Sequence, residues 1–147
     1  MLWMALRKLG RAPSKPLHNM KMENFSLQIQ PVFARAFAQD WADAWNSHNL
    51  ERILAHYDED VVLISPVALN LLKNGTGIVQ GKTALRNYFQ LGLKAYPDLR
   101  FELTDVLWGV ETIVAYYGNN VRDGKTAEVM QFNPAGKVVR VFANYNK

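Results

Sequence analysis

The hydrophobic pattern of this chain changes its period once, near Pro97, and that change limits the fold more than any other feature. Before it, apolar residues recur every three or four positions, as on one face of an α-helix. After it, they alternate with polar residues, as along a β-strand. The pattern predicts helices over 32–46, 50–57 and 82–96, and strands over 61–65, 99–108, 112–121, 126–133 and 138–145. Residues 67–81 have no clear period, so we expect an irregular connection there.

Glycine-containing turns separate the last four expected strands, with the sequences WGVE, RDGK and PAGK. Such short connections leave no room for parallel crossovers, so we expect an antiparallel sheet. Helices followed by strands are typical of an α+β fold. A curved antiparallel sheet wrapped around the long first helix, with two further helices, predicts a cone-shaped barrel with an internal cavity at its open end.

The net charge of +4 is concentrated at the start of the chain. Five of the 17 lysines and arginines precede Glu23, the first of 13 acidic residues, so the rest of the chain is nearly neutral. A neutral body offers no basic stripe to follow a phosphate backbone, and we expect no nucleic-acid partner.

Residues 1–30 read as a basic N-terminal tail, which we expect to be poorly ordered, ahead of a single domain over 31–147. The apolar run Leu2–Leu6 precedes the basic residues, whereas a secretory signal has its charge first and a longer apolar core. We therefore expect a cytoplasmic protein without a membrane anchor.

Metal and thiol chemistry have little support in the sequence. The absence of cysteine excludes disulfides, thiolate ligands and a cysteine nucleophile. The acidic run Asp58–Asp60 reads as a solvated turn, because consecutive side chains there point apart and no partner has ligand spacing. We expect neither a metal nor a cofactor.

Glu128 lies where a core residue is expected. Counting by twos along its strand places Glu128 on one face with Thr126, Met130 and Phe132. A carboxylate on such a face is paired, hydrogen-bonded or protonated, because burying it alone costs several kcal/mol. A structural pair with an inward arginine and a functional acid in a pocket are both open readings, and we favour the pocket.

Three strings, WADAWNSHNLERILAHYDEDVVLISP, GKTALRNYF and FNPAGKVVRV, resemble the SnoaL-like branch of the nuclear transport factor 2 fold superfamily. The resemblance covers about residues 31–147. It implies a cone-shaped α+β barrel whose other members include ketosteroid isomerase, scytalone dehydratase and limonene epoxide hydrolase. One scaffold hosts many activities there, so each functional position needs separate comparison.

Resemblance to ketosteroid isomerase implies a base at the end of the first strand, where this chain has Ser65. The two tyrosine positions that stabilise its oxyanion correspond to Trp41 and Phe89, neither of which carries a phenol. The third position, a protonated aspartic acid, corresponds to Glu128. Steroid isomerisation by that mechanism is therefore disfavoured.

Two other resemblances also fail at their functional residues. Limonene epoxide hydrolase implies Arg-x-Asp on a core strand and a later Asp, whereas this chain offers Arg100-Phe101-Glu102 on an earlier strand and Asn144. Scytalone dehydratase implies two pocket histidines, and His18, His48 and His56 lie elsewhere in the pattern. A SnoaL-type cyclase, which resembles this chain in using one sheet carboxylate, is the least contradicted.

We therefore expect a cofactor-independent isomerase, cyclase or hydrolase that acts on a small, largely apolar molecule, with Glu128 as acid or base. The alternative is a non-catalytic protein that binds a ligand in the same cavity or serves as a dimeric scaffold. Phe142, expected on the outer sheet face, and the resemblance both favour a homodimer. The expected substrate-binding residues are Trp41, Tyr57, Ser65, Tyr88, Asn119 and Tyr145.

Alternation alone leaves one choice open on the strand 112–121. Tyr117 and Asn119 share one face and Tyr116 lies on the other, and either set fits an inward orientation. Trp41, Tyr57 and Tyr88 likewise suit plain core positions as well as a cavity wall.

Overall fold

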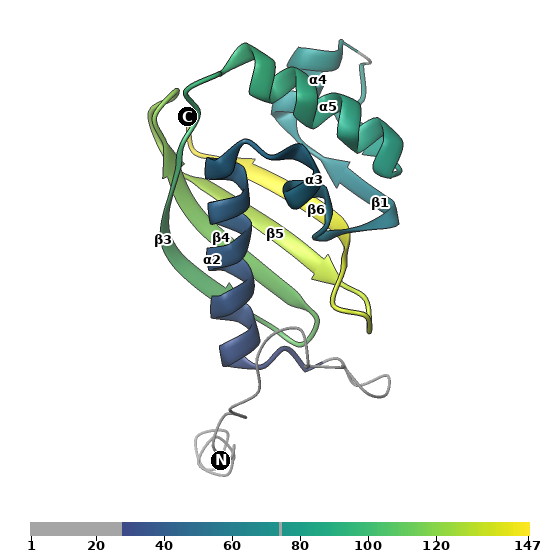
Figure 1. Ribbon diagram of the computed structural model, residues 1–147, viewed down its shortest axis with the longest axis vertical. Helices are drawn as coiled ribbons and strands as arrows, with labels where there is room; N and C mark the ends of the chain where they lie inside the picture. The colour runs from purple at the N-terminus through teal and green to yellow at the C-terminus, as the bar shows by residue number, and fades with distance from the viewer. Residues whose placement is uncertain (1–27, 74) are drawn as a thin grey trace.

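The structure is a computed structural model that describes residues 28–73 and 75–147. The expected tail over 1–30 lies almost wholly outside the described residues. Within them, a helical half precedes a strand-rich half, as the change of period predicts (Figure 1). The elements in chain order are α2 (Pro31–Ser47), α3 (Leu50–Leu54), β1 (Tyr57–Ile64), α4 (Pro66–Leu72), β2 (Ile78–Gln80), α5 (Lys82–Ala95), β3 (Phe101–Trp108), β4 (Thr112–Asn119), β5 (Thr126–Phe132) and β6 (Val138–Tyr145).

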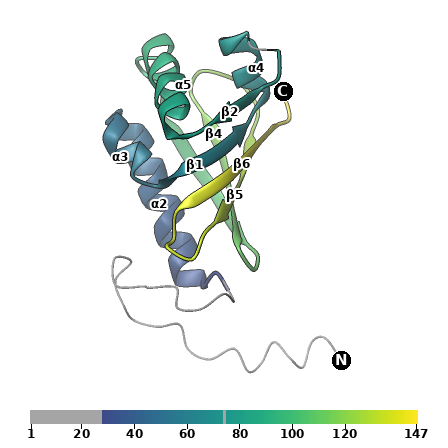
Figure 2. The same ribbon diagram turned by 90° about the vertical axis from the view of Figure 1, so that its right-hand side faces the viewer.

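The strands form one sheet in the order β2-β1-β6-β5-β4-β3, open at both edges. The sheet curves around α2, and α4 and α5 stand over one end of it (Figure 2). This arrangement confirms the expected α+β cone. One pairing differs from the prediction, because β1 and β6 run parallel. The rule of short connections does not apply to them, since about half of the chain separates these two strands.

Local predictions fail between residues 55 and 80. The second helix ends at Leu54 rather than Tyr57, and the acidic run Asp58–Asp60 belongs to β1 instead of a turn. The connection expected to be irregular contains α4 and β2. The Ser65 hydroxyl caps α4 by accepting a hydrogen bond from the Val67 N–H at 3.1 Å, and Pro66 occupies its first turn.

An aromatic layer joins α2 to the concave face of the sheet. Trp41 is fully buried and stacks on Phe101, with ring centroids 5.4 Å apart, and meets Tyr117 edge-on at 5.3 Å. Nearer the start of α2, Phe37 packs edge-on against Phe132 at 4.7 Å. Burial of such rings supplies the largest apolar contacts in a core and fixes the helix across the strands.

Asn46 fastens the end of α2 to the first residue of β3. Its side-chain amide donates to the Phe101 carbonyl at 3.0 Å and its oxygen accepts from the Phe101 N–H at 2.7 Å. The helix stops within the expected NSHN segment, where His48 adopts a left-handed conformation with φ of 57°. These contacts hold Phe101 in place beside the pocket described next.

Candidate functional site

A pocket of about 460 Å³ is lined by residues of α4, α5 and the sheet. Most of its wall is apolar, which suits a small organic ligand with few polar groups. Glu128 is the only acidic residue, and Arg122 the only lysine or arginine, among the described residues of the wall.

The sheet register explains why the Glu128 side chain reaches the pocket and is not covered by its neighbours in the sheet. Across the strands it is paired with Ala115 on β4 and with Ala143 on β6. Both partners carry only a methyl group, so no large side chain covers the carboxyl from either side. Tyr117, opposite Thr126, reaches diagonally across the sheet, and its hydroxyl donates to Glu128 Oε1 at 3.0 Å.

Burial controls the ionisation of Glu128. It raises the pKa of the carboxyl to about 7, although the hydrogen bond from Tyr117 acts in the opposite direction. The ion pairs found among the described residues do not include Glu128. The structural alternative, a pair with an inward arginine, therefore finds no support in the described chain. A carboxyl with this pKa both accepts and releases a proton near neutral pH.

Three further polar side chains line the pocket, those of Ser65, Tyr88 and Tyr145. Burial raises the pKa of both phenols, while the Ser65 side chain acts to lower it. Both tyrosines therefore stay protonated near neutral pH and can donate a hydrogen bond.

Five of the seven residues expected at the site line this pocket, and two lie behind it. The lining residues are Ser65, Tyr88, Asn119, Glu128 and Tyr145. Trp41 and Tyr57 are buried beneath the wall, where the Trp41 indole donates to the Tyr57 hydroxyl at 3.0 Å. The side-chain oxygen of Asn119 accepts from the N–H groups of Val121 and Arg122, both at 3.0 Å, so it shapes the loop after β4.

The structure also adds residues that sequence reasoning missed. Tyr117, rather than Tyr116, faces inward and is only 3% exposed, which resolves the choice left open by alternation. Arg122 comes from the loop between β4 and β5, where no periodicity indicates direction. Asn70 and Leu71 come from α4, a helix that was not expected.

The described chain offers neither a metal site nor a membrane-spanning helix. No three of its His, Asp or Glu side chains are grouped in a way that suits a metal ion. None of its helices is both long and apolar enough to cross a bilayer.

A curved, open sheet around one long helix, with a pocket at one end, gives this protein the cone-shaped α+β fold of NTF2-like proteins. The SnoaL-like domain family model matches residues 38–144. A SnoaL-like protein of unknown function from Burkholderia thailandensis is 33% identical, with a TM-score of 0.76 over 81% of this chain and 99% of that one. The chain therefore belongs to the SnoaL-like family.

More distant solved structures share the fold. An NTF2-like protein of unknown function from Cytophaga hutchinsonii is 11% identical, with a TM-score of 0.60 over 83% of this chain and 95% of that one. SalBIII, an epoxide hydrolase/cyclase-like enzyme of pyran ring formation in the polyether salinomycin, is 16% identical, with a TM-score of 0.62 over 77% and 90%. No curated protein matches the chain.

Proposed function

We propose that this protein binds a small, largely apolar molecule in the pocket and moves a proton on it, with Glu128 as both base and acid. One observation carries the proposal: a pocket carboxyl with its pKa raised to about 7 has a tyrosine as its hydrogen-bond partner and small neighbours that leave it accessible. Such a group is suited to general acid-base catalysis.

The pocket supports a cofactor-independent route through an enol or enolate. Ionised Glu128 takes a proton from a carbon next to a carbonyl, and the electron pair of the broken C–H bond moves to the carbonyl oxygen. A phenol of Tyr88 or Tyr145 donates to that oxygen. Glu128, now protonated, returns the proton to another carbon, which isomerises the molecule. Alternatively, the enolate carbon attacks a second carbonyl of the same molecule, the C=O π bond of that carbonyl breaks, and the resulting alkoxide takes the proton from Glu128, which closes a ring. Tyr117 keeps the carboxyl in one orientation throughout.

Proton exchange on a simple carbon acid tests the catalytic step without knowledge of the natural substrate. We expect the protein to speed exchange of the α-protons of 2-tetralone in D₂O, followed by proton NMR. Glu128→Gln should slow this exchange by about 100-fold or more. Glu102→Gln, which makes the same change at an exposed position of β3, serves as the control.

The outcome separates the two candidate functions. Equal exchange by the wild-type protein and Glu128→Gln would remove Glu128 from the reaction. Saturable binding of 2-tetralone and related ketones with no exchange above the buffer rate would favour the non-catalytic ligand-binding function.

The ionisation of Glu128 is tested directly by its side-chain carboxyl ¹³C shift during a pH titration. We expect a midpoint near 7, because burial outweighs the single hydrogen bond. A midpoint near the ordinary value of 4.5 would contradict the acid-base role.

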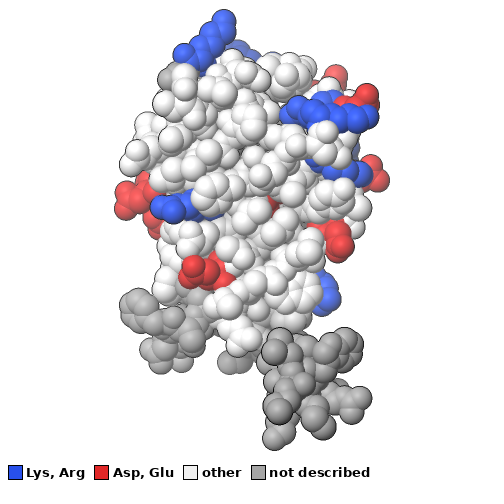
Figure 3. Space-filling model, turned by 180° about the vertical axis from the view of Figure 1, so that it is seen from behind, with Lys and Arg blue, Asp and Glu red and all other residues white. Residues whose placement is uncertain are grey.

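We also propose a homodimer formed through the outer sheet face. A row of apolar residues crosses this face, since Leu107 is paired with Val114, Val114 with Val129, and Val129 with Phe142. Leu107 and Phe142 are 54% and 40% exposed. Charged side chains lie mainly toward the margins of this face (Figure 3). A continuous apolar row of this kind favours burial against a second copy.

Light scattering after size-exclusion chromatography tests the dimer. We expect the wild-type protein to elute as a dimer and Phe142→Glu as a monomer, because a buried unpaired charge opposes association. Leu91→Glu makes the same change on the exposed side of α5 and should leave the dimer intact. A wild-type monomer at 100 μM or so would overturn the proposal.

A further inference from the structure

Among the described residues of the pocket wall, Arg122 carries the one positive charge. Glu128 is the one acidic residue there, and the other wall residues are apolar or neutral. Arg122 follows β4 in the loop that Asn119 shapes by accepting its backbone N–H. Its guanidinium lies over the ring of Tyr145, with Cζ 4.4 Å from the ring centroid, and one nitrogen donates to the backbone oxygen of Lys147 at 2.7 Å. These contacts fix the head group beside a pocket tyrosine.

Most N–H donors of the Arg122 guanidinium are not used by contacts within the described chain. Arginine carries five N–H donors, and the contacts seen in the described chain use one of them. The ion pairs of the described residues do not include Arg122. Its charge acts on the neighbouring Tyr145, whose pKa it tends to lower against the effect of burial.

The pocket wall therefore carries two chemically different charged groups. Glu128 faces the space between two alanines, and Arg122 presents a planar set of donors beside Tyr145. The rest of the wall is largely aromatic and aliphatic, including Phe89, Leu99 and Phe101. A guanidinium matches the two oxygens of a carboxylate better than any neutral group.

We propose that the pocket selects amphipathic ligands that carry one carboxylate, which Arg122 binds while the apolar body packs against the aromatic and aliphatic wall. This inference rests on the proposed function for the role of Glu128 and adds the substrate class: a small organic acid whose carboxylate is held by Arg122 while another carbon reacts at Glu128. Arg122 is thus a specificity-determining residue, and it takes no part in the proton transfer.

A matched pair of ligands isolates the carboxylate. 2-Naphthylacetate and 2-naphthylacetamide have nearly the same shape and differ in charge, and calorimetry or NMR shift titration measures the affinity of each. We expect the wild-type protein to bind the acid about tenfold more tightly than the amide, as hydrogen bonds to a charged group provide. Arg122→Gln should abolish that preference while leaving amide affinity unchanged, and Arg122→Lys should retain part of it.

Arg140→Gln is the control, because Arg140 is exposed on the strand β6 and is not part of the pocket wall. It should keep the full preference for the acid. The preference should also weaken at high salt, since an exposed charge pair is screened.

Several results would overturn the inference. The first is equal affinity of the wild-type protein for the acid and the amide, or no binding of the acid at millimolar concentration. The second is an equal loss of affinity for both ligands in Arg122→Gln. The third is the same loss of preference for the acid in Arg140→Gln. An equal loss of both ligands would assign Arg122 only to holding the end of the chain through Lys147.

Glu128→Gln keeps this test independent of the proposed reaction. If it retains the preference for the acid while the wild-type protein shows no proton exchange, the proposed function fails and the inference stands. If exchange depends on Glu128 and the acid has no advantage, the inference alone fails.

Discussion

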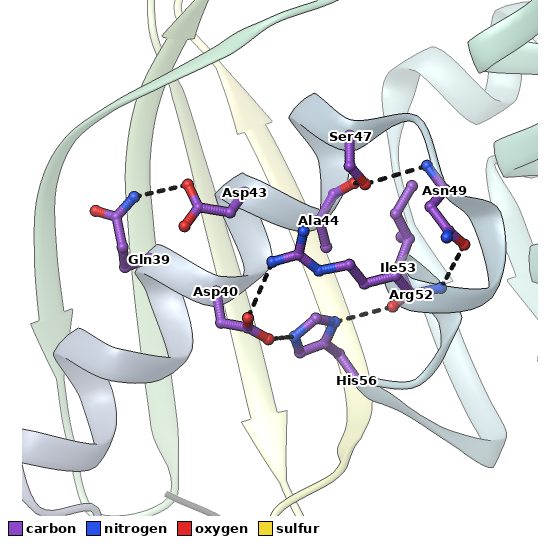
Figure 4. Close-up of polar contacts among 9 residues, drawn as sticks. All are labelled: Gln39, Asp40, Asp43, Ala44, Ser47, Asn49, Arg52, Ile53 and His56. Carbon is purple, nitrogen blue, oxygen red and sulfur yellow. Dashed lines mark hydrogen bonds and ion pairs between the residues drawn. The ribbon is translucent and has the colours of Figure 1, made fainter.

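Two carboxyl groups of this protein, Asp40 and Glu128, meet opposite environments. Asp40 on α2 lies against α3, where its Oδ2 contacts His56 Nε2 at 2.7 Å and its Oδ1 accepts from Arg52 at 3.2 Å (Figure 4). Burial acts to raise its pKa, but the hydrogen bonds and charges of His56 and Arg52 outweigh it and lower the pKa. Asp40 thereby links two helices.

Glu128 has a neutral phenol in place of those partners. With Tyr117 as its donor, burial prevails and its pKa rises to about 7. The Asp40 side chain is also 46% exposed, so the comparison shows that burial and the charge of the partner together decide how a carboxyl ionises. A cationic partner fixes it as a structural anion, and a neutral partner leaves it ready to exchange a proton near neutral pH.

The largest effect is expected on the pH dependence of stability. The folded-state pKa of Glu128 lies above its ordinary value of 4.5, so the native state binds more protons than the unfolded state between pH 4.5 and about 7. Stability should therefore fall as pH rises through this window, by up to about 3 kcal/mol. Urea denaturation at pH 5 and pH 8 measures the fall, which Glu128→Gln should remove. If Glu128→Gln shows the same fall in stability between pH 5 and pH 8, other titratable groups cause that fall.

The opposite carboxyl is tested by Asp40→Ala. His56 is buried, and losing its carboxylate partner leaves a ring nitrogen without its acceptor, at a cost of about 1–3 kcal/mol. Urea denaturation at pH 7 gives the loss. Asp43→Ala is the control, because Asp43 is exposed and bonds only to Gln39 in the described contacts. Equal losses in the two variants would contradict a linking role for Asp40.

Asp40 and Glu128 should also affect stability differently at acid pH. Because the folded-state pKa of Asp40 is lowered, its contribution is present above its ordinary value of 3.8 and is lost as pH falls through the folded-state value. Stability should thus decline at the acid end, and less so in Asp40→Asn. Glu128 produces no decline there, since it is already protonated.

Most of the fold was predictable from the sequence because local hydrophobic periodicity determines most of the helices and strands. The long helix α2 and the last four strands follow from spacing alone, while the parallel pair β1–β6 has no local signal, since its partners lie at distant points of the chain. The helix α4 did have a signal. Ser65 before Pro66 is a helix cap followed by a first-turn proline, whereas we expected the strand 61–65 to lead into an irregular connection.

The site was predictable where it depends on strand alternation. Glu128 stands out because a carboxyl on an inward face conflicts with its apolar neighbours. Tyr117 did not, because adjacent tyrosines fit both faces equally and only packing against Trp41 decides between them. Arg122 lies in a loop, where side-chain direction has no period and depends on the Asn119 contacts.

The smallest effect tests whether the neutral partner tunes Glu128. Tyr117→Phe removes the hydroxyl that lowers the pKa of Glu128 and keeps the ring that packs on Trp41 and Phe101. The pKa of Glu128 should therefore rise further, by up to about one unit, which matches the free energy of one hydrogen bond. Carboxyl ¹³C titration measures the shift, and Tyr116→Phe on the outer face of β4 is the control. A fall in the pKa would mean that Tyr117 acts on Glu128 mainly by keeping water out, because admitting water stabilises the ionised form more than the lost hydrogen bond destabilises it.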